Sequence, residues 1–172
     1  MKNKYGQNFL INDTIIKKII SYSKIDNKSN VLEIGPGDGS LTKEIIKIKP
    51  KNFIAVEIDQ ALNEKLKQFF INTKYKLIFQ DALKLIEKNY FNENFTIISN
   101  LPYNISLALL VKWIYQVNNS VYPNRMILMF QKEVADRILS EHNSKKYSRI
   151  SILVSAFYNV KKITDVCKKD FF

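Results

Sequence analysis

The fold of this chain is decided at residues 31–40, whose sequence is VLEIGPGDGS. The first four residues predict a short buried strand, and glycines at 35, 37 and 39 predict a tight turn that a ligand can approach closely. Residues 41–46, LTKEII, predict a helix. The glycine spacing is not the Gly-x-Gly-x-x-Gly of dinucleotide-binding folds. Taken alone, the turn is either a ligand-binding loop or a plain tight turn, so other parts of the sequence are needed to distinguish these two interpretations.

Further apolar runs follow the first strand at 53–56, 76–79, 95–98 and 126–130, with helical patterns between them. A sixth strand is expected at 156–160, AFYNV. Alternating strands and helices predict an α/β fold with a mostly parallel, doubly wound sheet. Ligands of such sheets lie beyond the carboxyl ends of the strands.

Polar groups stand at three of these strand ends. Glu57, after the second strand, is placed to accept the ribose hydroxyls of a nucleoside. Asp81, after the third, either accepts from an adenine amino group or caps a helix. Residues 100–103, NLPY, offer an amide, a rigid backbone and an aromatic ring to a planar base. With no Walker-type lysine, a glycine loop that binds a nucleoside points to S-adenosylmethionine beside a base amine.

Composition bounds the remaining possibilities. The 172 residues suit one domain, and 27 Lys and Arg against 16 Asp and Glu give a net charge of +11, which favours a nucleic-acid partner. Compositional drift toward Lys, Asn and Ile is the alternative explanation for this charge. The single Cys167 and single His142 argue against a disulfide or a metal site. No apolar run suits a membrane span or signal peptide, so a cytoplasmic protein is expected.

Six strings, in order along nearly the whole chain, resemble the ribosomal RNA adenine N6,N6-dimethyltransferase family. They are QNFL at 7–10, VLEIGPGxGxLT at 31–42, EID at 57–59, DA at 81–82, NLPYNIS at 100–106 and QKEVA at 131–135, where x marks a position at which the resemblance specifies no residue. Gly35-Pro36-Gly37 and Leu101 resemble the small-subunit enzymes more than the antibiotic-resistance relatives that act on large-subunit RNA. The resemblance implies a Rossmann-like fold and a monomer. It also implies that S-adenosylmethionine is used to dimethylate adenosines of small-subunit ribosomal RNA, or of a precursor particle, during ribosome maturation.

The resemblance further implies a cofactor site. Its expected members are Gln7, Asn8, Leu10, Gly35, Gly37, Glu57, Ile58, Asp81, Ala82 and Asn100. Among them, Asn8 and Leu10 would close over the cofactor, and the two glycines would pass near its methionine part. Glu57 would hold the ribose, and Asp81 the adenine amine.

The same resemblance implies an acceptor site. The Asn100 side-chain oxygen and the Leu101 carbonyl would accept the two hydrogens of the target N6 amine, and Pro102 would fix the turn. Tyr103 would stack on the flipped-out adenine, with Phe171 covering its opposite face.

The sequence departs from the family at Ser148, where glycine is expected, at Ser155, where glutamine is common, and in length. The family continues into a last antiparallel strand and a helical domain. We therefore expect residues 1–172 to form a C-terminally incomplete catalytic domain with an unpaired sheet edge. Two alternatives remain open: a non-catalytic RNA-binding or ribosome-assembly factor on the same fold, and a DNA adenine-N6 methyltransferase. The glycine spacing disfavours a nicotinamide oxidoreductase.

Overall fold

The structure, a computed structural model, describes residues 8–172. Within this range the strands are β1 (Asn30–Ile34), β2 (Asn52–Glu57), β3 (Lys76–Phe79), β4 (Phe95–Asn100) and β5 (Pro123–Met129). The α-helices are α1 (Asp13–Ser23), α2 (Ser40–Ile48), α3 (Asn63–Phe70), α4 (Ser106–Ile114), α5 (Lys132–Ile138) and α6 (Arg149–Ser155). Short 3-10 helices are η1 (Gln60–Leu62), η2 (Ala82–Lys84), η3 (Glu87–Asn89), η4 (Tyr115–Asn118) and η5 (Lys168–Asp170). The first five expected strands are confirmed to within a few residues.

All strand pairings in the sheet are parallel, in the order β3-β2-β1-β4-β5. The chain builds outward from β1 to β3 and then returns to the other side of β1 for β4 and β5. β1 and β4 are therefore neighbours at the point where the strand order reverses. Parallel sheets bind ligands in the crevice beyond the carboxyl ends of the strands at such a point. Here this crevice lies between the glycine turn after β1 and the tetrapeptide after β4.

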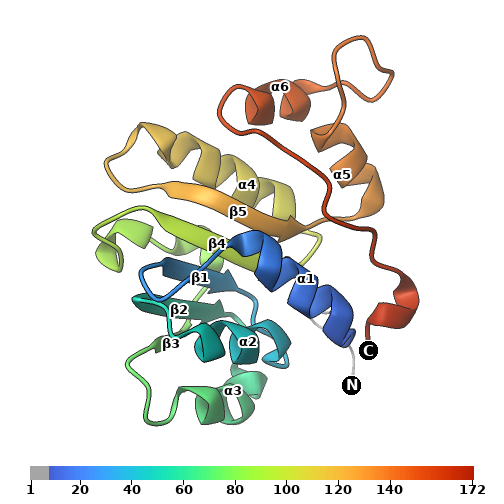
Figure 1. The fold of residues 1–172 in the computed structure, drawn as a ribbon. Coiled ribbons are helices and arrows are strands. Elements are labelled where there is room, and N and C mark those ends of the chain that lie inside the picture. Colours follow the sequence, from blue (N-terminus) through green and yellow to red (C-terminus); the bar gives the residue numbers. More distant parts are fainter. Residues whose placement is uncertain (1–7) are drawn as a thin grey trace.

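Helices cover both faces of the sheet (Figure 1). Successive strand residues point to opposite faces, so neighbouring residues of β1 enter different cores. Val31 packs in a cluster with Ile15 of α1 and Ile45 of α2, whereas Leu32 packs in a cluster with Trp113 of α4. The doubly wound arrangement expected from the apolar runs is thereby confirmed.

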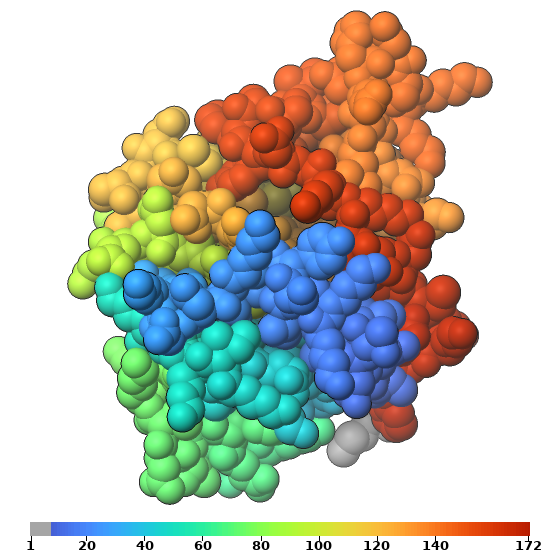
Figure 2. Space-filling view, in the orientation of Figure 1, coloured from blue at the N-terminus to red at the C-terminus, as the bar shows by residue number. Residues whose placement is uncertain are grey.

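The expected sixth strand is wrong. The backbone N–H groups of Ala156 and Tyr158 donate to the carbonyls of Ile152 and Val154, so they complete the last turn of α6 instead of joining a sheet. β5 is consequently the last strand in the sheet order, and no strand pairs with its outer edge within residues 8–172. After α6 the chain runs down past α5 toward α1 (Figure 2).

Glu33 is a carboxyl group buried in the core side of β1, only 1% exposed. Its Oε2 accepts a hydrogen bond of 2.6 Å from the Thr42 hydroxyl of α2. Its Oε1 has no hydrogen-bond partner among residues 8–172. Burial raises the pKa of Glu33 to about 8; the Thr42 bond opposes this, and the nearby charges of Glu57 and Asp38 add to it. Glu33 is therefore protonated in the folded protein at neutral pH.

This burial predicts a pH-dependent stability. In the unfolded chain the Glu33 carboxyl titrates near its ordinary value of 4.5, and in the folded protein near 8. Between these values the folded state binds the extra proton, so the free energy of unfolding falls as pH rises through this window. Glu33→Gln removes the titration and keeps an acceptor for Thr42. In urea unfolding at pH 5, 7 and 9, parent stability relative to Glu33→Gln is expected to decrease at each step.

The matched control for this experiment is Glu64→Gln on α3, because the Glu64 side chain is 89% exposed. The difference in free energy of unfolding between Glu64→Gln and the parent is expected to stay constant with pH. A difference between parent and Glu33→Gln that is also constant from pH 5 to 9 would contradict the buried, raised-pKa assignment.

Candidate functional site

The glycine turn after β1 has a backbone that only glycine adopts easily. Gly35 and Gly37 have φ values of +66° and +59°, in the left-handed region. A Cβ atom at Gly37 would lie 2.9 Å from the ring of Phe9, too close without movement of that ring. The turn therefore keeps a surface of bare backbone, and an aromatic residue from the N-terminal segment packs against it.

Glu57, at the end of β2, is a buried carboxylate that accepts hydrogen bonds from this turn and from the backbone that follows β2. It is 3% exposed, and its Oε2 accepts from the Gly37 N–H at 3.2 Å. Its Oε1 accepts from the N–H groups of Ile58 at 2.9 Å and Asp59 at 3.0 Å. A carboxylate has about four acceptor sites, so these bonds hold the turn in place and still leave capacity for a ligand hydroxyl.

The N-terminal segment crosses the site and contacts the acceptor tetrapeptide. The Asn100 side chain donates from Nδ2 to the carbonyl oxygen of Asn8 at 2.7 Å. Because a carbonyl can only accept, this bond fixes which end of the amide faces Asn8. Oδ1 is then the end of Asn100 that remains as an acceptor for another group. Gln7, expected in the cofactor site, lies outside the described residues.

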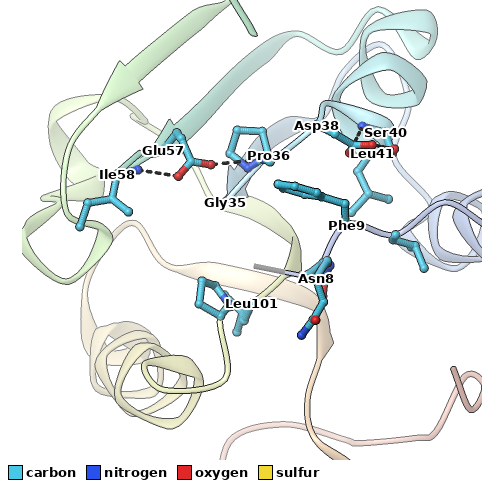
Figure 3. Close-up of a pocket in the computed structure, with 14 residues that line it drawn as sticks. Asn8, Phe9, Gly35, Pro36, Asp38, Ser40, Leu41, Glu57, Ile58 and Leu101 are labelled. Carbon is cyan, nitrogen blue, oxygen red and sulfur yellow. Dashed lines mark hydrogen bonds between the residues drawn. The ribbon is translucent and has the colours of Figure 1, made fainter. Parts of the chain in front are cut away.

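A pocket lies where these segments meet (Figure 3). Asn8 and Phe9 face Glu57 and Ile58 across it (Figure 3). Its lining residues are Asn8, Phe9, Leu10, Gly35, Pro36, Gly37, Asp38, Ser40, Leu41, Glu57, Ile58, Asn100, Leu101 and Pro102. The structure thus brings together most of the expected site residues from four separate parts of the chain. Phe9 and Asp38 were not singled out from the sequence, although Phe9 lies inside one of the strings that carried the resemblance; Asp38 stands at a position that the resemblance left unspecified.

The tetrapeptide 100–103 turns sharply at the end of β4. Leu101 is buried at 2% exposure, and Pro102 packs against the glycine turn, 3.7 Å from where a Cβ at Gly35 would lie. The Ile105 N–H donates to the Pro102 carbonyl, and the Ser106 hydroxyl donates to the Tyr103 carbonyl, which closes the turn into α4. Tyr103 is half-buried and is not among the described residues that line the pocket.

Asp81 and Ala82 lie at the end of β3 and outside the lining of this pocket. Asp81 accepts from the Leu83 N–H at 2.9 Å and so caps η2, as the alternative interpretation of this residue expected. Ala82 is 6% exposed and belongs to the core on the α4 side of the sheet. A role of these two residues toward adenine stays a prediction.

Phe171 lies beside Leu10 of the N-terminal segment, whereas Asn8 of the same segment contacts Asn100. Its backbone forms an antiparallel bridge with Leu10, and its side chain packs against the core that contains Leu10 and α1. Asn12 supports this pairing by donating from Nδ2 to Asp170 Oδ1 at 2.7 Å. Phe171 is absent from the pocket lining within residues 8–172, so its stacking on a target base stays a prediction.

A family model described as Ribosomal RNA adenine dimethylase matches residues 1–172. The chain is 47% identical over 170 residues to ribosomal RNA small subunit methyltransferase A of Pelagibacter ubique (strain HTCC1062), covering 99% of this chain and 64% of that protein. It is 42% identical over 173 residues to the protein of the same name in Wolbachia pipientis subsp. Culex pipiens (strain wPip), again covering 99% of this chain and 64% of the relative. The chain therefore spans 64% of the length of both relatives.

Solved structures agree with this assignment. A dimethyladenosine transferase from Plasmodium falciparum superposes with a TM-score of 0.83 at 32% identity, covering 95% of this chain and 57% of that one. The 23S rRNA methyltransferase ErmE superposes with a TM-score of 0.64 at 24% identity over 76% of this chain and 50% of its own, which shows a shared fold. The fold is thus that of a Rossmann-like methyltransferase. Since the family match extends over the whole sequence, the chain belongs to the ribosomal RNA adenine dimethylase family.

Proposed function

We propose that this protein binds S-adenosylmethionine and transfers two methyl groups to the N6 amine of adenosines in small-subunit ribosomal RNA. The observation that carries the proposal is the Asn100 side chain, held at the rim of the pocket by its bond to the Asn8 carbonyl. That bond leaves Oδ1 as an acceptor next to the glycine turn. The methyl acceptor and the methyl donor would therefore meet where β1 and β4 end.

The residues of the pocket fit S-adenosylmethionine. Glu57 presents a buried carboxylate suited to ribose hydroxyls, and the glycine turn presents backbone without side chains. Asp38, which also lines the pocket, is an anionic partner for an amino group. When bound, S-adenosylmethionine supplies an electrophilic methyl group on sulfur. No phosphate-binding lysine is required for such a ligand.

The chain's own contribution to the reaction is positioning and electrostatics. Asn100 Oδ1 and the Leu101 carbonyl would accept the two N–H hydrogens of the target amine and direct its lone pair at the methyl group. Pro102 holds that geometry, because its ring packs against Gly35. Tyr103 would stack on the adenine and keep it out of its helix. The amine is unprotonated at neutral pH, so the site needs no strong general base.

A basic cleft on α5 supports an RNA substrate. The cleft lies between α5 and residues 145–148, and four of its lining residues are basic against two acidic ones, of which Asp136 pairs with Lys146 at 2.6 Å. Its lining residues are Lys132, Glu133, Asp136, Arg137, Lys145, Lys146, Tyr147 and Ser148. Basic side chains with an aromatic neighbour suit a phosphate backbone and its bases. The net charge of +11 adds a longer-range attraction. We propose small-subunit RNA, or a precursor particle that contains it, as the partner of a monomeric protein.

In the described part of the chain, no helix is both long and apolar enough to cross a membrane.

Transfer of labelled methyl groups tests this proposal directly. We expect labelling of small-subunit particles that lack the modification, with dimethyladenosine recovered after digestion, and no labelling of duplex DNA. Labelling of DNA alone would favour a DNA adenine methyltransferase. Binding of RNA particles without any methyl transfer would favour a non-catalytic assembly factor.

A further inference from the structure

Glu87, in η3, has a buried carboxylate whose hydrogen-bond donors come from α4 and from η4, which directly follows α4. It is 3% exposed, and its Oε1 accepts from Lys112 Nζ at 2.8 Å and from Trp113 Nε1 at 3.0 Å. Its Oε2 accepts from Gln116 Nε2 at 2.9 Å. A buried charge is tolerated when it is paired and its other lone pairs are satisfied, and this arrangement meets both conditions. The η3 segment is thereby fixed against α4 and η4.

Lys112 is the only charged residue of α4, and it makes two further hydrogen bonds. Its Nζ donates to the carbonyl of Ala82 at 3.0 Å and to that of Leu85 at 2.7 Å. With Glu87, these bonds use all three donors of the ammonium group. The two carbonyls flank η2, so the side chain of Lys112 ties both ends of that turn to α4.

The hydrogen bonds from Lys112 matter because of where η2 lies in the fold. η2 follows Asp81 directly at the end of β3, which is an outer strand in the sheet order β3-β2-β1-β4-β5. A turn at a sheet margin has a neighbouring strand on one side only, so other contacts must fix its position. α4, which supplies the contact, begins three residues after Tyr103 of the tetrapeptide. Lys112 therefore joins the end of β3 to the helix that follows the proposed methyl-acceptor site.

We propose that Lys112 is a positioning residue for the adenine end of the cofactor site. It does not touch the ligand; it holds the Ala82 carbonyl and so sets where the Asp81 carboxylate lies. This inference rests on the proposed function and on the predicted role of Asp81 as the acceptor for the adenine amino group of the cofactor. Removal of the ammonium should weaken binding only of ligands that carry that amino group.

The test compares Lys112→Met with Trp113→Phe by calorimetric titration of S-adenosylhomocysteine. Lys112→Met removes the hydrogen bonds to the carbonyls of Ala82 and Leu85, whereas Trp113→Phe removes a donor to Glu87 and some buried ring volume but leaves those two hydrogen bonds in place. We expect Kd to rise about tenfold for Lys112→Met, as for one lost charge-assisted hydrogen bond, and to change less than about twofold for Trp113→Phe. If Lys112→Met does not fold, Lys112→Met/Glu87→Gln removes the carboxylate that would be left buried and unpaired.

The inosine analogue, S-inosylhomocysteine, separates positioning from general loosening because hypoxanthine lacks the amino group. Lys112→Met should bind this analogue as the parent does. Equal losses for both ligands, or equal losses for both variants, would overturn the positioning role while leaving the proposed function intact. A parent protein that binds neither ligand would overturn the proposed cofactor, and this inference with it.

Discussion

Asn100→Ala is expected to lower methyl transfer at least about a hundredfold, the usual cost of removing one group that stabilises developing charge in an active site. The substitution removes the Oδ1 acceptor for the target amine. It also removes the Nδ2 donor to the Asn8 carbonyl, so a modest loss of cofactor affinity, within roughly threefold, is expected from that single hydrogen bond. Single-turnover transfer to small-subunit particles gives the first quantity, and calorimetry with S-adenosylhomocysteine gives the second.

Asn100→Asp separates the two ends of the amide. Aspartate keeps an oxygen toward the amine but places an oxygen opposite the Asn8 carbonyl, where Nδ2 donates in the parent. We expect this variant to lose more cofactor affinity than Asn100→Ala and to retain more transfer at saturating cofactor. Asn119→Ala, at an exposed position after η4, is the matched control and should behave as the parent. If Asn100→Ala lost cofactor affinity and transfer by the same factor, Asn100 would be structural rather than catalytic.

The sequence predicted the sheet and most of the pocket because both depend on local patterns. Apolar runs marked the strands, and parallel strands necessarily bring their carboxyl ends to one edge, so Glu57 and Asn100 had to lie near the glycine turn. What the pattern could not supply were the bonds between these parts. The Gly37 N–H donating to Glu57, and Asn100 donating to Asn8, join residues far apart in the chain.

The differences from expectation share one physical cause, which is competition between local and distant partners. Residues 156–160 have a strand-like composition, yet their first N–H groups bond to α6 carbonyls that are already close. The backbone pairing of Phe171 with Leu10, from the other end of the chain, was likewise not visible in the sequence, and the stacking of Phe171 on a base stays a prediction. Lys112 is the single charged residue of the apolar helix α4, and no role was predicted for it from the sequence. Its three acceptors come from a segment 25 to 30 residues away, and no periodicity marks them.

Glu57→Ala is expected to weaken cofactor binding by about tenfold to a hundredfold, because hydrogen bonds to a charged group contribute roughly 1.5–3 kcal/mol. The carboxylate is buried and lines the pocket, so a ribose that binds there exchanges its water for these oxygens. Calorimetric titration of S-adenosylhomocysteine measures the change. Glu64→Ala, at an exposed position on α3, is the control and should leave Kd unchanged.

A weaker Kd alone would not establish that Glu57 holds the ribose, because its carboxylate also accepts from the N–H groups of Gly37, Ile58 and Asp59. Loss of these bonds could disorder the glycine turn and weaken every ligand. A 2′,3′-dideoxy analogue of S-adenosylhomocysteine distinguishes the two effects in a double-mutant cycle. If Glu57 accepts from the hydroxyls, the analogue binds the parent more weakly than the natural ligand does, and Glu57→Ala binds both alike. If removal of the hydroxyls costs parent and variant the same factor, Glu57 supports the turn and the ribose is held elsewhere.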